Sequence, residues 1–196
     1  MADVVATMTE PPIDWQPFIE GSPTWAHATT QRAVEALGPG AGRQALDVGS
    51  GNGRDARFLA DAGFDVTAVD ICVAAPDLQH PQIQLYCSDI VDFPLARYAL
   101  VNASLVFPFI PRSRFAELWT ALLAALLPGG IIAGHLSATR DWKVDAGHAW
   151  ACEATELEAL LRGLETVSLV ENEVDGPNRA HAVVHKHNYE FVARKR

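Results

Sequence analysis

The segment Ala45–Asp70, ALDVGSGNGRDARFLADAGFDVTAVD, decides the fold. It is bracketed by two short apolar runs, Gln44–Val48 and Phe64–Val69, which are typical of strands buried on both faces. Between them, residues 55–62 carry apolar side chains at helical spacing, and Gly63 is placed to end that helix in a left-handed conformation. The segment therefore predicts a strand, a turn, a helix and a second strand, which is the repeating unit of an α/β fold.

The turn after the first strand is rich in glycine. Gly49, Gly51 and Gly53 alternate with Ser50 and Asn52. Glycine adopts backbone conformations that a side chain forbids, and it lets the main chain approach a ligand closely. This turn is expected at the carboxyl end of a strand, where doubly wound sheets bind their ligands.

The second strand ends in an acid, Asp70, about twenty residues after the glycine turn. A carboxylate at this position suits a ribose, because it can accept hydrogen bonds from both hydroxyls. The glycine turn and Asp70 together predict a site for an adenosine-containing cofactor.

The glycine spacing separates two classes of cofactor. A dinucleotide site requires G-x-G-x-x-G, but here the pattern is G-x-G-x-G and Arg54 stands where the third dinucleotide glycine belongs. The pattern, led by Asp47, resembles that of class I S-adenosylmethionine-dependent methyltransferases. A nicotinamide-dependent oxidoreductase is disfavoured by this spacing, and an ordinary strand–turn–helix with a glycine loop is the structural alternative.

The resemblance implies a Rossmann-like, doubly wound sheet of seven strands, mostly parallel, with an antiparallel last strand in a single α/β domain. We expect that domain over residues 23–196, preceded by an N-terminal arm over residues 1–22. The ending VVHKHNYEFVARKR is similar to that of a small bacterial branch related to tellurite-resistance methyltransferases, with matches at Lys186 and His187.

The resemblance also implies which residues bind S-adenosylmethionine, or its product S-adenosylhomocysteine. The glycine loop would hold the methionine end, Asp70 the ribose, and the acid after the third strand the adenine. Taken alone, that acid would be interpreted as a turn-forming Asp, but the upstream glycine motif favours adenine binding. The sulfonium would lie beside a residue at the end of the fourth strand. The implied cofactor-binding set is Asp47, Gly49, Ser50, Gly51, Asn52, Gly53, Asp70, Ile71, Asp89, Ile90 and Ser104.

Composition excludes several other classes of function. The chain has 196 residues, of which 49% are hydrophobic and 20% charged, as expected for one globular domain. Its net charge of −9 argues against nucleic-acid or anionic-membrane partners, and no apolar run approaches the length of a membrane span. Three scattered cysteines, with no metal-ligand spacing, and an N-terminus without signal-peptide features predict a cytoplasmic protein without a metal site.

The remaining elements follow from periodicity and turn residues. Prolines keep the first residues from being helical, and Ser22-Pro23 predicts a helix start, with Trp25 packed inward and the helix ending at Leu37. Residues 71–81 predict a truncated helix or loop. The other expected elements are strands over 82–87, 98–105, 131–136, 165–174 and 183–193, a helix capped by Ser113 and ended by Pro128-Gly129-Gly130, and a helix begun by a capping box at 155–158.

The methyl acceptor is predicted only in outline, as a small molecule. Aromatic residues near the expected site are the candidates for its pocket: Trp15, Phe18, Phe107, Trp142 and Trp150. Trp15 and Phe18 read equally well as a flap over the site or as an arm tucked into a groove, and Phe107 as core. Methyl transfer from a sulfonium needs little acid–base help, but a hydroxyl or amine acceptor would benefit from a general base. The candidates for that base are His135, His148 and Tyr189.

Alternatives remain for a histidine pair, for enzymatic activity and for the oligomeric state. His185 and His187 alternate on one face of the last strand, which is read as hydrogen-bonded or solvated and not as a metal pair. A cofactor-binding regulator without turnover is the alternative to an enzyme. A monomer and a weak dimer are both compatible with the sequence.

Overall fold

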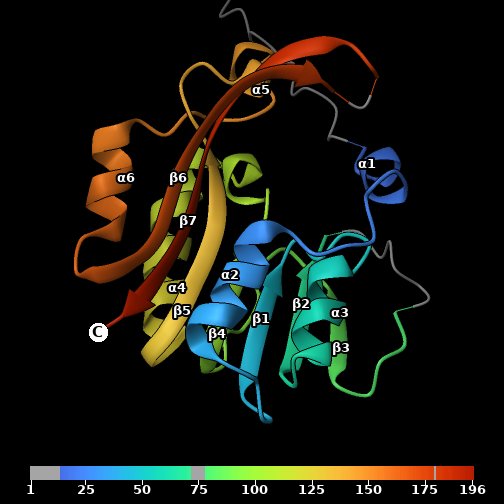
Figure 1. Ribbon diagram of the computed structural model, residues 1–196, viewed down its shortest axis with the longest axis vertical. Helices are drawn as coiled ribbons and strands as arrows, with labels where there is room; N and C mark the ends of the chain where they lie inside the picture. Colours follow the sequence, from blue (N-terminus) through green and yellow to red (C-terminus); the bar gives the residue numbers. More distant parts are fainter. Residues whose placement is uncertain (1–13, 72–77, 179) are drawn as a thin grey trace, which may run out of the picture.

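The computed structural model describes residues 14–71, 78–178 and 180–196, except for the side chain of Phe18. Its centre is a seven-stranded sheet of order β3-β2-β1-β4-β5-β7-β6 (Figure 1). The sheet is parallel from β3 to β5, and β7 runs antiparallel to both of its neighbours. The predicted fold class is therefore confirmed. The strands are β1 (Gln44–Val48), β2 (Asp65–Asp70), β3 (Ile83–Cys87), β4 (Tyr98–Ala103), β5 (Leu126–Ser137), β6 (Leu164–Pro177) and β7 (Val183–Lys195).

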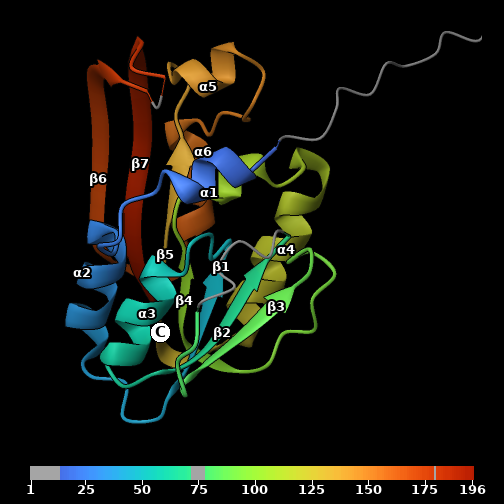
Figure 2. The same cartoon turned by 90° about the vertical axis from the view of Figure 1, so that its right-hand side faces the viewer.

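Helices cover both faces of the sheet. Helices α2 and α3 lie on one face and α4 on the other (Figure 2), and α6 packs into the same apolar cluster as α4. Each face has its own core, and the central strands β1 and β4 are buried between them. The helices are α1 (Gln16–Glu20), α2 (Ala28–Leu37), α3 (Arg54–Asp61), α4 (Arg112–Ala125), α5 (Trp142–Asp145) and α6 (Ala154–Leu161), with a 3₁₀ turn η1 (Phe107–Phe109).

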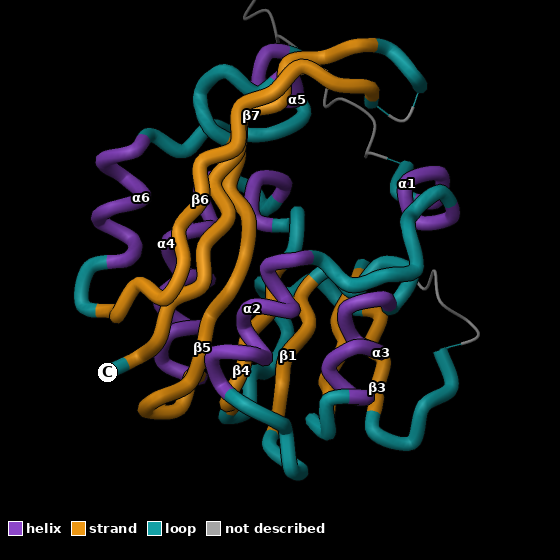
Figure 3. Tube along the Cα trace, in the orientation of Figure 1, coloured by secondary structure: helices purple, strands orange, loops and turns teal. Residues whose placement is uncertain are grey.

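The parallel strands β1 to β4 end at the same edge of the sheet, so the loops that follow them gather there. The β6–β7 hairpin continues beyond this edge and arches toward α1 (Figure 3). The sheet therefore places four loops, one helix and one hairpin around a single region. Within the described residues, no helix has the length and apolar character needed to cross a membrane.

The helix predicted to start at Ser22-Pro23 begins later in the structure. Helix α2 begins at Ala28, with His27 as its N-cap, and residues 22–25 form a loop. The Asn52 side-chain amide donates to the carbonyls of Ser22 and Pro23 at 3.3 and 3.1 Å, which holds these residues outside the helix. Trp25, predicted to pack inward, is 70% exposed. The proline-rich lead also contains helix α1, which accommodates Pro17 in its first turn, where a missing N–H costs nothing.

Three other boundaries differ from prediction. Helix α4 begins at Arg112, so Ser113 is not its cap. Helix α6 begins at Ala154, with no side-chain cap bond, so the predicted capping box is absent. Strand β5 already starts at Leu126: it pairs Leu126 with Tyr98 and Ile131 with Leu100, so Pro128-Gly129-Gly130 forms an irregularity within the strand.

Some predictions fall on other parts of the chain. The first thirteen residues of the expected arm and most of the segment 71–81 lie outside the described residues. The flap and the truncated helix therefore stay predictions.

Candidate active site

The carboxyl ends of β1 to β4 open into a cavity of about 830 Å³. This volume falls in the range of sites for small molecules and cofactors. The lining includes the glycine loop after β1, the ends of β2 and β4, and the turn after β3. Helix α1 adds Trp15 and the hairpin adds Asn178, so segments far apart in sequence close the cavity on its outer side.

The glycine loop has the backbone that its sequence predicts. Gly49, Gly51 and Gly53 have φ angles of +65°, +54° and +76°, which are left-handed conformations that disfavour any side chain. The Gly49 amide donates to the carbonyl of Val69 at 2.8 Å, and the Gly51 amide donates to Oδ2 of Asp70 at 2.8 Å. Asp70 therefore shapes the loop as well as lining the cavity.

Two acids and two isoleucines form the β2–β3 side of the cavity. Asp70 ends β2, and Asp89 follows β3 with its Oδ1 accepting from the amide of Val91 at 3.0 Å. Ile71 is 54% exposed beside Asp70, whereas Ile90 is buried. A cavity wall that carries both an exposed apolar side chain and two carboxylates suits a flat ring with polar groups at its edge.

Two buried polar atoms lack a partner in the described part of the chain: Oδ2 of Asp47 in β1 and Oγ of Ser50 in the glycine loop. Buried side-chain oxygens are nearly always hydrogen-bonded, so such atoms mark a place for a ligand or water. Ser50 also lines the cavity. Burial, followed by the charge of Asp55, raises the pKa of Asp47 well above its usual value.

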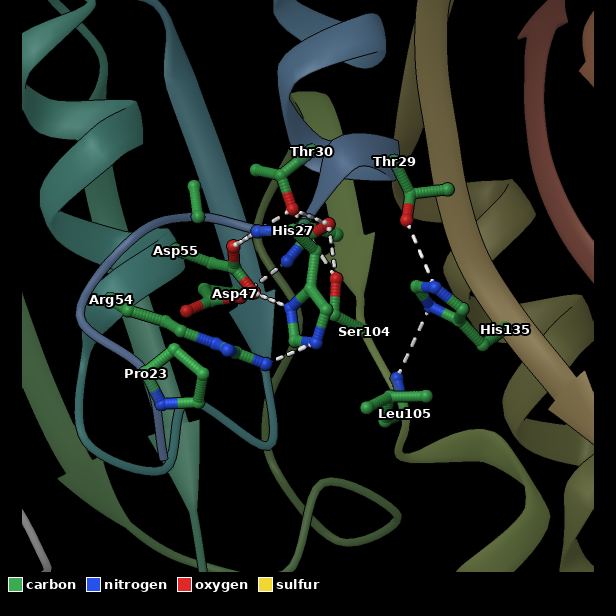
Figure 4. A network of polar contacts seen from close by, with 12 residues as sticks. Pro23, His27, Thr29, Thr30, Asp47, Arg54, Asp55, Ser104, Leu105 and His135 are labelled. Carbon is green, nitrogen blue, oxygen red and sulfur yellow. Dashed lines mark hydrogen bonds and ion pairs between the residues drawn. The ribbon is translucent and has the colours of Figure 1, made fainter. Parts of the chain in front are cut away.

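A polar network connects the first turn of α3, directly after the glycine loop, to α2 and to the end of β4 (Figure 4). Both oxygens of Asp55 bind His27: Oδ1 accepts from its backbone amide at 2.8 Å, and Oδ2 lies 2.7 Å from its Nδ1. Thr30 Oγ1 lies 3.0 Å from Oδ1 of both Asp55 and Asn102, and 3.3 Å from Oγ of Ser104. Burial raises the pKa of Asp55, but the hydrogen bonds from His27 and Thr30 outweigh it and lower the pKa overall.

His135 is a buried neutral imidazole at the same wall. The Leu105 amide donates to its Nδ1 at 3.3 Å, so Nε2 carries the proton and faces Thr29 Oγ1 at 3.0 Å. Burial lowers the pKa of His135 to about 3. The ring also supports Leu105, a non-glycine residue with a left-handed φ of +59° at the cavity lining.

The structure brings most of the sequence-predicted residues into the cavity wall. Of the acceptor-pocket candidates, Trp15 and Trp142 line it; of the candidate bases, His135 does. Every residue of the implied cofactor set lines it except two: Asp47 is buried below the loop, and Gly53 lies where an added Cβ would meet Leu78. Phe18 belongs to α1, but its side chain lies outside the description.

Four predicted candidates lie elsewhere. Phe107 is fully buried and packs on Phe115, Trp119 and Phe191, so placing it in the pocket was wrong; its neighbour Phe109 lines the cavity instead. The other three are absent from the cavity lining: His148 is exposed beside Trp142, Tyr189 is buried, and Trp150 packs on Phe115 with its Nε1 donating to the carbonyl of Ile110 at 2.9 Å.

Sequence reasoning missed the network partners His27, Thr30 and Asp55. The sequence offers one signal for them, since Asp55 directly follows the glycine loop, but its partners lie 25 and 28 positions earlier. On β7, His187 Nε2 lies 2.7 Å from Oε1 of Glu171. In the described ranges, no group of three or more His, Cys, Asp or Glu side chains is arranged to bind a metal.

A doubly wound sheet with a left-handed glycine loop and acids at neighbouring strand ends defines a nucleotide-type binding fold. Comparison with known families is more specific: a family model described as a methyltransferase domain matches residues 24–168. The chain therefore belongs to the methyltransferase domain family.

Solved structures share the fold at low sequence identity. TehB from Haemophilus influenzae superposes with a TM-score of 0.74 at 19% identity, over 87% of this chain and 63% of that one. The N-methyltransferase NodS from Bradyrhizobium japonicum, solved with S-adenosylhomocysteine, gives a TM-score of 0.67 at 18% identity, over 91% and 90% of the two chains. Among curated proteins, Hemagglutinin 1 of Eikenella corrodens is 32% identical over 115 residues, which are 55% of this chain. The chain spans 37% of that relative's length.

Proposed function

We propose that the protein transfers the methyl group of S-adenosylmethionine to a small-molecule acceptor. The observation that carries this proposal is that two left-handed glycines, Gly49 and Gly51, and two strand-end acids line one cavity. Membership of the methyltransferase domain family supports it independently. The structural relative NodS was solved with the product of such a reaction.

The residues of the cavity suit each part of this cofactor. The glycine loop suits the amino-acid end, and the Ser50 hydroxyl in it has no partner among the described residues. Asp70 would accept hydrogen bonds from the ribose through the oxygen that does not bind the Gly51 amide. Asp89, with Ile71 and Ile90, would hold the adenine between a polar edge and apolar faces.

S-adenosylmethionine, when bound, supplies a methyl group on a positively charged sulfur. The protein then has to align the acceptor and exclude water. Ser104 and Leu105 at the end of β4 form one wall for the acceptor, and Trp15, Phe109 and Trp142 supply apolar surface. His135 is a poor base here, because both of its ring nitrogens are engaged and its pKa is about 3. An acceptor that is already electron-rich fits this wall best.

The proposal includes a small acceptor and a cytoplasmic setting. A single cavity of about 830 Å³ must take both the cofactor and the acceptor, which favours a small molecule. Cys87 and Cys152 are free thiols, as expected in a reducing compartment.

Two measurements test the proposed function. Calorimetry should show binding of S-adenosylhomocysteine and none of NAD; heat with NAD alone would overturn the proposal. A methyl-transfer screen across thiols, phenols, amines and chalcogen oxyanions should then find an acceptor. Tight cofactor binding without transfer to any of them would instead indicate a regulator.

A further inference from the structure

Three side chains form a chain of contacts from the interior to the cavity: Asp55, His27 and Arg54 (Figure 4). The carboxylate of Asp55 is buried and binds His27 at two points, 2.8 and 2.7 Å away. The far ring nitrogen of His27, Nε2, contacts the guanidinium of Arg54. Arg54 and His27 both line the cavity next to the glycine loop.

The donors and acceptors of these three side chains determine where the protons lie. A guanidinium has only donors, so Arg54 donates and Nε2 of His27 accepts. The ring is then neutral with its proton on Nδ1, which donates to Oδ2 of Asp55. The buried carboxylate thus orients the guanidinium through the imidazole. Arg54 carries five N–H donors, which allows it to bind His27 and a carboxylate together.

The positions of Asp70 and Asp89 indicate how the cofactor is oriented in the cavity. Asp70 and Asp89 lie at the ends of β2 and β3, so the adenosine is expected on that side of the loop. His27 lies on the other side, with its ring centroid 5.4 Å from that of His135 on β5. The amino-acid end of the cofactor must therefore extend toward His27 and Arg54.

The other cationic side chains of the cavity lie on different elements. Lys143 in α5 is paired with Asp141 at 2.7 Å. Lys186 in β7 donates to the carbonyl of Pro177 at 2.7 Å, near the tip of the hairpin. Arg54 directly follows the glycine loop, so it is the cation placed for a ligand that the loop holds.

We propose that Arg54 binds the α-carboxylate of the cofactor's amino-acid end, and that His27 and Asp55 are positioning residues for its guanidinium. This inference rests on the proposed function, since it takes S-adenosylmethionine and S-adenosylhomocysteine as the ligands. It adds a specificity: the site distinguishes an adenosyl thioether with an amino-acid end from one without it.

Calorimetry with two ligands tests the proposal. S-adenosylhomocysteine has the amino-acid end, and 5′-methylthioadenosine lacks it. Arg54→Gln should weaken S-adenosylhomocysteine binding by about 10- to 100-fold, the range expected for losing a charge-assisted hydrogen bond. It should change 5′-methylthioadenosine binding by less than about threefold, because that ligand has no carboxylate to lose. Arg162→Gln, an exposed arginine at the end of α6, is the matched control and should change neither affinity.

Each outcome has a distinct meaning. If the wild-type protein binds neither ligand, the proposed function fails. If it binds both, and Arg54→Gln weakens them equally or not at all, the role of Arg54 fails while the proposed function stands. Arg54→Lys retains the charge and should recover part of the loss, which separates a carboxylate contact from a folding defect.

The positioning role has its own readout, the ratio of the two affinities. His27→Ala should lower the preference for S-adenosylhomocysteine, because Arg54 loses its acceptor. His27→Gln, which offers an amide oxygen in place of Nε2, should lower it less. A general loss of stability would weaken both ligands together and leave the ratio unchanged, and that result would refute the positioning role.

Discussion

Asn102 donates through its side-chain amide to Oδ1 of Asp47 at 2.7 Å, and the two residues face each other in the register of β4 and β1. Asp47 is 1% exposed, and its second oxygen has no partner in the described part of the chain. Burial, then the charge of Asp55, raises the pKa of Asp47 well above its usual value. The central strands of the sheet thus meet at a carboxyl group that favours its neutral form.

We predict that Asp47→Asn stabilises the unliganded protein at alkaline pH. Above the ordinary carboxyl pKa, near 4, the unfolded chain releases a proton that the folded chain retains, so this group lowers the free energy of unfolding as pH rises. Asn is neutral at every pH and can still accept from Asn102. Thermal melts should show the variant more stable than wild type at pH 8 and similar near pH 4. A variant that is less stable at pH 8 would show that Asp47 is ionised there.

For His135 we predict the opposite pH dependence, a loss of stability at acid pH. Its pKa falls from about 6.5 to about 3 on folding, so the unfolded chain binds a proton first and stability is lost as pH falls through this window. Between pH 6.5 and 4 the loss from this one group is about 3 kcal/mol.

His135→Gln and His135→Leu should both flatten the decline of unfolding free energy below pH 6.5, measured by urea denaturation. The slope is the readout, because either variant also loses the hydrogen bond from Leu105 at every pH. Slopes identical to that of the wild type would mean that the buried ring is not neutral.

The segment from β1 to β2 could be predicted to within a residue because its signals are local. The apolar runs, the glycine turn and Gly63, which has a φ of +88°, each specify their own conformation. Site residues that belong to these signals were predicted with them. Asp70, for example, is defined by the strand that it ends.

The features that the sequence did not predict depend on contacts between residues far apart in the chain. Ser22-Pro23 is a good local helix start, but the amide of Asn52 binds both carbonyls, and the helix begins later. Phe107 and Phe109 look alike in sequence; the 3₁₀ turn sends the first into the core and the second toward Trp15, with ring centroids 4.9 Å apart. The pairing of His27 with Asp55 joins residues 28 positions apart, which no local pattern encodes.

Asp70→Ala tests the ribose assignment. The substitution should weaken S-adenosylhomocysteine binding by about 1–3 kcal/mol, because the ribose and the Gly51 amide lose a charged acceptor. Titration calorimetry provides the measurement, and Asp61→Ala is the control, since Asp61 ends α3 with a side chain 75% exposed. Equal affinities for wild type and Asp70→Ala would show that the ribose lies elsewhere.

Alanine substitutions at Gly49 and Gly51 separate the cost of backbone strain from the cost of steric crowding. Both Gly49 and Gly51 have left-handed φ, so Ala at either position should cost about 1–2 kcal/mol. A Cβ at Gly49 would also lie 2.6 Å from Cγ2 of Val106, whereas at Gly51 nothing lies closer than 4.0 Å. Gly49→Ala should therefore lose a further 1–3 kcal/mol, roughly, in urea unfolding. Adding Val106→Ala should recover most of that excess in the Gly49→Ala background and none in the Gly51→Ala background. Equal losses for the two single variants would mean that the loop and Val106 move apart freely, and the cavity wall would then be adaptable.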